Sequence, residues 1–513
     1  MSTRPDIVLL VLDTQRVDRL SCYGYPLETT PHLDALASDA TLFRHAFSTA
    51  QWTVPSHTSM FTGLYPGRHN MLHASSILPD SFMTLAERLR DAGYFTGAFC
   101  NNPLLGVVNT GLQRGFQSFL NYAGWMTSRP NQAGMDQSFF DRYRRHFKRF
   151  LAHAVTDMQD IFAHSDTLLD LSFSPLLAPL WQTALSFKGN TARSLRDAAR
   201  LHVERKGLEK DQPIFSFINL MGTHMPYHPP HRYTEHLAPE VLKDRAARHY
   251  LRQFNSDVFG WLAPLTTSIE EQHKEILDGM YNAEVANQDE LVGEFLEKLR
   301  SSGTLDHTLL IVCADHGEHL GEKQLMGHSI SLYNTLVHVP LIIRDPNGDL
   351  QRSSVIDHVV STRRIFHTAL SAAGSATTAE QAFTLAQSTN SDPDGGRIFA
   401  LGVTPQNLLN VIQRRRPELI QLRHCDQPRR AVWSERYKLI QTGEAELELY
   451  DVFDDPDETI NLRDILPEQV ELLQEYLQGF MSHLNLSDSA QTQAEEYSDP
   501  QVYRRLHDLG YLE

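Results

Sequence analysis

The run Ile7–Leu12 (IVLLVL) is apolar without alternation and ends directly at Asp13 and Thr14. Such a run is typical of a central strand that is buried on both faces of a parallel sheet. It is too short to cross a membrane or to form the apolar core of a secretion signal. A carboxylate and a hydroxyl group therefore follow at the point where a buried strand is expected to end.

Further apolar runs alternate with amphipathic stretches along the chain. Strands are expected at Phe95–Cys100, Ile214–Leu220, Leu309–Cys313 and Pro340–Ile343, and helices at Pro31–Ala37, Leu85–Ala92 and Ile276–Leu299. This alternation predicts an α/β fold with a large, mostly parallel central sheet that is flanked by helices. Ligands of such sheets bind beyond the carboxyl ends of the strands, and Asp13, His224 and Asp315 each follow a predicted strand.

The pattern of residues divides the chain into three parts. Residues 1–375 are expected to form the main α/β domain, and a helical insertion at 131–200 lies within it. Residues 376–486 are expected to form a small α+β subdomain, and 487–513 a polar tail. The predicted elements of the subdomain are strands at Ala431–Thr442 and Glu446–Val452 and a helix at Glu468–Leu484. Aromatic and basic residues recur at helical spacing over 139–151, which favours a packed helical cap over contact with a membrane surface.

Charge and cysteine usage exclude several classes of protein. The 513 residues include 46 Lys and Arg against 63 Asp and Glu, a formal net charge of −17 at pH 7. A nucleic-acid partner held by bulk charge is therefore not expected. The four cysteines lie far apart without a CxxC pair, which argues against a disulfide scaffold and a cysteine zinc site. We expect a cytoplasmic enzyme, and a homo-oligomer is compatible with the sequence.

The segment Thr53–Gly63 begins with a hydroxyl residue, has a proline suited to a first helical turn, and ends at a glycine. Thr53 would then lie at the positive end of a helix dipole, which favours an anionic substrate such as a phosphate or sulfate ester. The alternative is an ordinary threonine cap of the helix. The segment by itself supports both interpretations equally.

Asp315 and His316 directly follow a predicted strand, and Asp13 adds a carboxylate from another strand end. Oxygen ligands with one imidazole suit Mg²⁺, Mn²⁺, Ca²⁺ or Zn²⁺. His224 and His328 have the chemistry to donate a proton to a leaving oxygen or to bind an oxyanion, although either could be structural.

Together these segments resemble the sulfatase family of the alkaline phosphatase superfamily. The family pattern Cys/Ser-x-Pro-Ser-Arg-x-x-x-x-Thr-Gly is similar to Thr53–Gly63, and its metal motifs are similar to Asp13–Gly24 and Asp315–Glu318. His224–Tyr227 resembles its histidine motif, and Glu448–Leu462 resembles its C-terminal signature. The resemblance covers about residues 6–465. It implies an alkaline phosphatase/sulfatase-like fold and an anionic phosphate- or sulfate-ester substrate.

The chain departs from this pattern at the nucleophile and at several basic positions. Sulfatases oxidise the Cys or Ser at the head of the motif to formylglycine, whereas oxidation of Thr53 would give a ketone, so no formylglycine is expected. Other departures are His57 for the family's Arg, Asn101–Leu104 for its Gly-Lys-x-His segment, Thr14 for its second opening Asp, and His328 for its later Lys. Threonine nucleophiles occur in phosphodiesterases and in phosphoglycerol and phosphoethanolamine transferases of the superfamily.

The resemblance to these transferases implies one divalent metal ion, because Leu220 stands where two-metal phosphodiesterases carry a further Asp. The implied metal ligands are Asp13, Asp315, His316 and Thr53. The metal would lower the pKa of the Thr53 hydroxyl, which would attack phosphorus or sulfur. The remaining implied roles are protonation of the leaving oxygen by His224 or His328 and contact with the non-bridging oxygens by His57 and Asn102.

These roles predict a metal-dependent hydrolase of a phosphate diester or a phosphonate monoester. One alternative is a sulfatase that uses Thr53 directly. A second is a non-catalytic member that binds an anion or a partner, although the retained Asp13, Asp315 and His316 argue against it. A third, transfer of a lipid-derived head group, depends on the basic aromatic segment 139–151.

Overall fold

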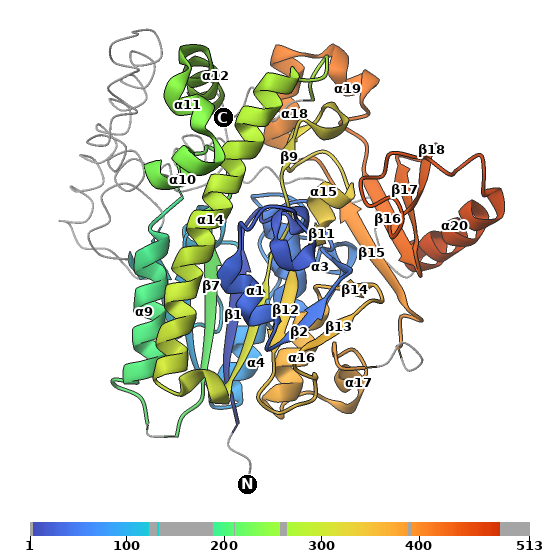
Figure 1. Ribbon diagram of the computed structural model, residues 1–513. Coiled ribbons are helices and arrows are strands. Elements are labelled where there is room, and N and C mark those ends of the chain that lie inside the picture. The colour runs from blue at the N-terminus through green and yellow to red at the C-terminus, as the bar shows by residue number, and fades with distance from the viewer. Residues whose placement is uncertain are drawn as a thin grey trace, which may run out of the picture.

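The computed structural model describes residues 4–122, 131–132, 188–209, 211–256, 264–387 and 392–482. Within these ranges the central sheet has nine strands in the order β13-β2-β12-β8-β1-β7-β4-β5-β6. The central strand β1 (Asp6–Leu12) pairs in parallel with β7 (Ile214–Leu220) and β8 (Thr308–Cys313). Helices cover both faces of this sheet, and a smaller sheet lies at one side of it (Figure 1). The predicted α/β fold is confirmed.

The other strands of the sheet are β4 (Phe95–Cys100), β5 (Ser118–Asn121), β6 (Asn131–Gln132), β12 (Leu341–Arg344), β2 (Thr41–Phe43) and β13 (Ser354–Ile356). Most neighbours are parallel, but β12 runs antiparallel to β8 and β2, and β6 runs antiparallel to β5. The four strands β8, β1, β7 and β4 form a continuous parallel core. Their carboxyl ends therefore lie along one edge.

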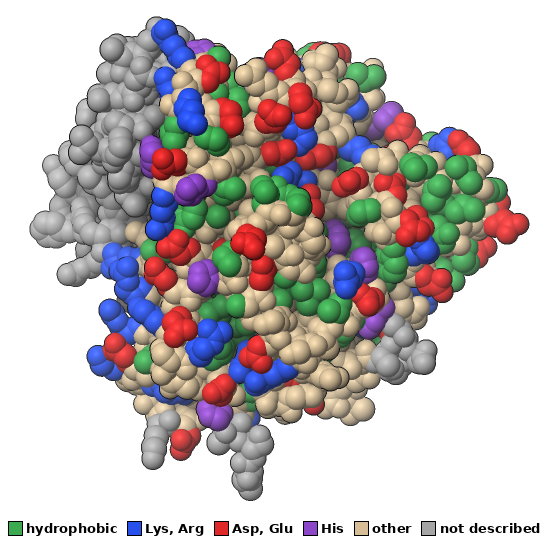
Figure 2. Space-filling model, in the orientation of Figure 1, with side chains coloured by type: hydrophobic (Ala, Val, Ile, Leu, Met, Phe, Trp, Pro, Cys, Tyr) green, Lys and Arg blue, Asp and Glu red, His purple; other side chains and the backbone are tan. Residues whose placement is uncertain are grey.

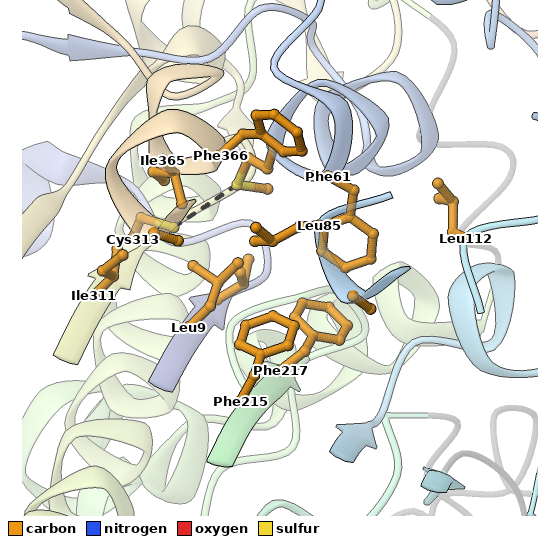
Figure 3. Close-up of a cluster of buried hydrophobic side chains, with 14 of the residues drawn as sticks. Leu9, Phe61, Leu85, Leu112, Phe215, Phe217, Ile311, Cys313, Ile365 and Phe366 are labelled. Carbon is orange, nitrogen blue, oxygen red and sulfur yellow. Dashed lines mark hydrogen bonds between the residues drawn. The ribbon is translucent and has the colours of Figure 1, made fainter. Parts of the chain in front are cut away.

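Successive side chains of β1 enter two different hydrophobic clusters, because neighbouring residues of a strand point to opposite faces. Ile7, Leu9 and Val11 pack with α2 (Thr53–Thr62), α4 (Leu85–Asp91) and α16 (Arg364–Ala372) on one face. Figure 3 shows this cluster, in which Leu9 and Phe217 of the sheet lie among side chains from these helices. The opposite face packs against α1 (Pro31–Ala37), α9 (Thr191–Glu204) and α14 (Glu271–Ser301).

The C-terminal sheet has four antiparallel strands, which are β15 (Arg397–Gly402), β16 (Arg429–Ser434), β17 (Tyr437–Thr442) and β18 (Glu446–Asp451). The helix α20 (Pro467–Ser482) packs on one face of it. The prediction of a single strand over Ala431–Thr442 is wrong, because β16 and β17 form a hairpin that turns at Glu435, where φ is +55°. The strand β15 was not predicted. Figure 2 shows hydrophobic side chains gathered over this subdomain. Ile460 and Ile465, which follow β18, are both exposed.

Two further helices contain residues used below, which are α3 (Pro66–His69) and α15 (Asn334–Val337). Most of the predicted insertion at 131–200, including the segment 139–151, lies outside the described residues. The predicted tail at 487–513 lies outside them as well. Where the structure is described, no helix combines the length and apolar character needed to span a membrane.

Acid should destabilise this fold through buried neutral histidines, of which His69 is a clear case. Its Nδ1 accepts a hydrogen bond from the Met71 amide at 3.1 Å, and its Nε2 lies 3.1 Å from Ser59 Oγ. Burial lowers the pKa of His69 from 6.5 to about 3. Because the unfolded chain binds this proton and the folded chain does not, the stability present above pH 6.5 falls as the pH falls toward 3. The loss should reach about 2 kcal/mol between pH 6.5 and pH 5.

The measurement is the thermal unfolding midpoint as a function of pH. His69→Gln should reduce its decline between pH 7 and pH 5, a window that lies across the unfolded pKa. The exposed His307, changed to Gln, serves as the control and should leave the decline unchanged. An identical decline in wild type and His69→Gln would show that His69 is not one of the groups responsible.

Candidate active site

Polar side chains from four adjacent strands meet at one edge of the central sheet. Asp13 follows β1, Asn102 follows β4, Asn219 lies near the end of β7, and Asp315 follows β8. All four are buried, with at most 1% of the residue exposed. This is the edge at which parallel sheets bind ligands.

Asp13 is held so that only one of its two oxygens is available. Its Oδ2 accepts hydrogen bonds from Asn102 Nδ2 at 2.7 Å and from Asn219 Nδ2 at 3.2 Å. Its Oδ1 has no hydrogen-bond partner among the described residues and lies 3.8 Å from His316 Nε2. Burial raises the pKa of Asp13, but the nearby histidines and the Asn102 hydrogen bond outweigh burial and leave the pKa below its usual value.

In Asp315 and His316, as in Asp13, one polar side-chain atom is held by hydrogen bonds and the other is available for a ligand. Asp315 Oδ1 accepts hydrogen bonds from the amides of Thr14 at 3.3 Å and His316 at 3.0 Å. Its Oδ2 lacks such a partner in the described part of the chain and lies 3.3 Å from His316 Nε2. His316 Nδ1 donates to the Gly317 carbonyl at 3.0 Å, which leaves Nε2 as the ligand atom. Burial and the neighbouring Asp13 carboxylate raise the pKa of Asp315 well above its usual value.

The ligand atoms of Asp13, Asp315 and His316 lie within 4.8 Å of one another. Two buried carboxylates repel each other unless a cation lies between them. Carboxylate oxygens with one imidazole nitrogen are a donor set for a divalent metal ion. The residues therefore fit such an ion, and the fit follows from the unsatisfied oxygens of the two carboxylates.

Thr53 is the first residue of α2, and its hydroxyl faces this cluster. Thr53 Oγ1 lies 3.4 Å from His316 Nε2 and 3.4 Å from Asn102 Nδ2. The interpretation of Thr53 as a helix cap is wrong, since the capping position is Trp52 and its side chain makes no capping hydrogen bond. Ser56 Oγ donates to the Asp315 carbonyl at 2.8 Å and fixes the start of α2 against the end of β8.

His224 and His328 lie beside the cluster in a row of imidazole rings. The ring centroids of His316 and His328 are 4.6 Å apart, and those of His328 and His224 are 4.9 Å apart. His328 Nδ1 donates to Glu318 Oε1 at 2.7 Å, and His224 Nδ1 donates to the Met225 carbonyl at 2.5 Å. Each ring therefore presents Nε2 as its remaining polar atom. Burial lowers the pKa of His328 to about 4 and also lowers the pKa of His224.

His57 is completely buried and contacts other protein groups on both nitrogens. Its Nδ1 donates to the Thr53 carbonyl at 2.9 Å and lies 3.4 Å from Asp315 Oδ2. Its Nε2 accepts from Asn219 Nδ2 at 3.4 Å. Burial lowers the pKa of His57 to about 4. The ring thus supports Thr53 and Asp315 from within the protein.

Comparison with known proteins agrees with this site. A family model described as Sulfatase matches residues 5–375. The chain belongs to the sulfatase family. It is 22% identical over 377 residues to an arylsulfatase of Clostridium perfringens. This match covers 72% of the chain and 74% of that relative. It is also 22% identical over 362 residues to an ulvan-active sulfatase of Formosa agariphila, in a match that covers 70% of this chain and 60% of that relative.

Solved structures share the fold of this sulfatase-family chain. A phosphonate monoester hydrolase of Agrobacterium radiobacter has a TM-score of 0.61 and 20% identity, and the match covers 93% of this chain and 95% of that one. A protein solved in complex with its substrate D-glucosamine-2-N,6-O-disulfate has a TM-score of 0.61 and 16% identity, with 95% and 100% covered. The predicted resemblance to the sulfatase family and the predicted fold are confirmed.

The sequence patterns did not indicate two residues that hydrogen-bond to side chains of this site, Asn219 and Glu318. Asn219 donates to both Asp13 and His57, and its only sequence signal is an amide one position before the end of an apolar run. Glu318 lies in the recognised motif and binds His328 Nδ1, while its Oε2 lies 3.4 Å from the Met225 amide. No spacing rule links either residue to its partners.

Gly317 leaves no space for a side chain. An ideal Cβ at this position would lie 2.0 Å from the Thr335 carbonyl oxygen. Gly317→Ala should therefore displace the segment that carries Asp315 and His316, at a cost of about 1–3 kcal/mol in folding free energy, and should lower metal content. Thermal unfolding and metal analysis of the purified variant test this. Gly479→Ala is the control, since a Cβ there meets nothing within 4 Å and Gly479 has no positive φ. Unchanged metal content in Gly317→Ala would contradict the prediction.

Proposed function

We propose that this member of the sulfatase family is a metal-dependent ester hydrolase that cleaves a phosphate diester or a phosphonate monoester with Thr53 as the nucleophile. The observation that carries the proposal is the Thr53 hydroxyl, 3.4 Å from His316 Nε2, beside the unsatisfied oxygens of Asp13 and Asp315. A divalent cation bound by these residues would lower the pKa of the hydroxyl and neutralise charge on the transferring group.

In the proposed reaction Thr53 Oγ attacks phosphorus, so that an Oγ–P bond forms while the bond from phosphorus to the leaving oxygen breaks. Nε2 of His224 or His328, the two imidazoles beside the cluster, takes up the proton that the Thr53 hydroxyl loses and passes it to the leaving oxygen. Asn102 Nδ2, which lies 3.4 Å from Thr53 Oγ1, donates to a non-bridging oxygen. Water then attacks phosphorus, the Oγ–P bond breaks, and the Thr53 hydroxyl is regenerated.

The chemistry of the intermediate favours phosphorus over sulfur. A formylglycine hydrate carries a second hydroxyl on the same carbon, which can expel the bound group by elimination. Thr53 has one hydroxyl, so its ester must be cleaved by attack on the central atom. We therefore propose phosphorus as the centre attacked. The similarity to a phosphonate monoester hydrolase in fold is consistent with this choice.

The second candidate function is sulfate-ester hydrolysis at the same residues. The observation that favours it is the naming of the relatives, which include an arylsulfatase and an ulvan-active sulfatase. In this alternative Thr53 attacks sulfur directly and no formylglycine is formed.

The two candidates separate in one experiment. Purified protein stripped with a chelator and reconstituted with Mn²⁺, Mg²⁺, Ca²⁺ or Zn²⁺ is assayed on aryl phosphodiester, phosphonate, phosphomonoester and sulfate, with metal content measured in parallel. We expect turnover of the diester or phosphonate that disappears on chelation and returns with metal. Sulfate preference by about 100-fold or more would replace our proposal by the alternative. A protein that binds no metal after reconstitution would favour a non-catalytic member.

A further inference from the structure

The backbone that carries His224 is held on both sides by one buried ion pair. Lys188 Nζ donates to the Gly222 carbonyl at 2.9 Å and to Glu284 Oε1 at 2.8 Å. The same Glu284 oxygen accepts the His228 amide at 2.7 Å. Lys188 is 8% exposed and Glu284 is 4% exposed. The segment 222–228 therefore begins and ends on this pair, and His224 lies between the two contacts.

The two charged residues belong to elements other than the loop that they hold. Lys188 lies shortly before α9, and Glu284 lies within α14. These helices contact each other along one face of the sheet (Figure 1). One helical turn beyond Glu284, Gln288 Oε1 accepts the Gly222 amide at 3.0 Å. A Cβ at Gly222 would lie 2.5 Å from that oxygen, so a larger residue there would displace the Gln288 side chain.

Stability alone is a weak reason to keep this pair. Removing two charges from water is costly, and apolar residues of similar volume often stabilise a protein as well or better in such positions. The pair here directs its hydrogen bonds to the backbone on either side of a functional histidine. A displacement of about 1 Å in a reacting group can cost about 100-fold in rate. Precise placement of His224 is a function that an apolar pair could not supply.

We propose that Lys188 and Glu284 are positioning residues that hold His224 Nε2 where it protonates the leaving oxygen. This inference rests on the proposed function, because it takes the proton donor role of His224 from it. We call the pair the Lys188–Glu284 clamp.

The test compares substrates with different leaving groups. Esters that release para-nitrophenolate need little help from an acid, whereas the matching phenyl esters need it strongly. In Lys188→Met, we expect kcat for the phenyl ester to fall by at least about tenfold more than kcat for the para-nitrophenyl ester, with KM little changed. His224→Ala should show the same dependence on the leaving group with a larger amplitude.

A second buried lysine provides the matched control. Lys438 Nζ donates to Glu458 Oε1 at 2.5 Å and to the Leu332 carbonyl at 2.6 Å, and both charged side chains are buried. Lys438→Met therefore breaks an equivalent ion pair far from His224 in sequence. It should lower the thermal midpoint without changing the ratio of the two rates.

Hydrogen exchange gives a readout that does not depend on turnover. In Lys188→Met, amides of the segment 222–228 should exchange at least about tenfold faster than in wild type, while Lys438→Met leaves them unchanged. If Lys188→Met gives no soluble protein, Lys188→Met/Glu284→Gln is used instead, because it leaves no buried charge without a partner.

The outcomes distinguish the clamp from the proposed function. Leaving-group dependence in His224→Ala but a uniform loss in the Lys188 variant would overturn the clamp alone. Absence of leaving-group dependence in His224→Ala would overturn the donor role of His224 and the clamp with it. Unchanged exchange in 222–228 would overturn the clamp whatever the activity.

Discussion

Replacement of Thr53 by alanine should abolish metal-dependent ester cleavage, with a loss in kcat of about 10⁴-fold or more. The variant removes the only atom proposed to bond to phosphorus. Asp13, Asp315 and His316 remain, and their ligand atoms stay within 4.8 Å of one another. We therefore expect Thr53→Ala to keep most of its metal, as measured by metal analysis beside the kinetic assay.

Thr53→Ser is the matched control for this prediction. It keeps a hydroxyl at the start of α2 and removes one methyl group, so a substantial part of the activity should remain. Activity that survives in Thr53→Ala would show that the nucleophile is water or another side chain. Loss of metal in Thr53→Ala would instead make the hydroxyl a dominant ligand.

Replacement of Asp315 by asparagine should have opposite effects on activity and on the stability of the metal-free protein. In the wild type, the amides of Thr14 and His316 donate to Asp315 Oδ1. The side-chain oxygen of the asparagine can still accept both hydrogen bonds. The new amide nitrogen would replace the Oδ2 that lies 3.3 Å from His316 Nε2 and would remove the repulsion between Asp315 and Asp13. The metal-free variant should be more stable by about 1 kcal/mol, while metal binding and activity are lost.

The measurement is the thermal midpoint with chelator and with added metal. Wild type should be stabilised by metal, and Asp315→Asn should not. Asp289→Asn is the control, because Asp289 is also buried but accepts the amides of His32 and Leu33, each at 2.9 Å, at the start of α1. It should lose stability and keep its response to metal. A metal-free Asp315→Asn protein less stable than wild type would contradict the repulsion argument.

Much of the fold follows from local patterns. The strands β1, β4, β7, β8 and β12 and the helices α1 and α4 lie within a residue or two of their predicted positions, because buried strands and amphipathic helices have distinct apolar periods. The sequence does not indicate the turn between β16 and β17, because its residues are Glu435 and Arg436 and not the glycine, proline or asparagine that is typical of turns. Its positive φ at Glu435 depends on the pairing of the two strands around it.

Asp13, Asp315, His316 and Thr53 could be singled out from the residues that follow predicted strands and from their resemblance to family motifs. Local sequence specifies which residue types reach the edge of the sheet, because strand ends and helix starts are encoded over a few positions. It does not specify which oxygen of each carboxylate stays available. That depends on amides from other elements, such as Asn102 and Asn219 on Asp13 Oδ2.

The contacts of the Lys188–Glu284 clamp are also not specified by local sequence. Lys188 and Glu284 are 96 positions apart, and neither lies in a motif. This pair depends on the packing of α9 and α14, which contact each other and leave both charged residues buried. The chain thus encodes the residues of the candidate site locally, whereas their orientation and the contacts around His224 arise between distant elements that only packing brings together.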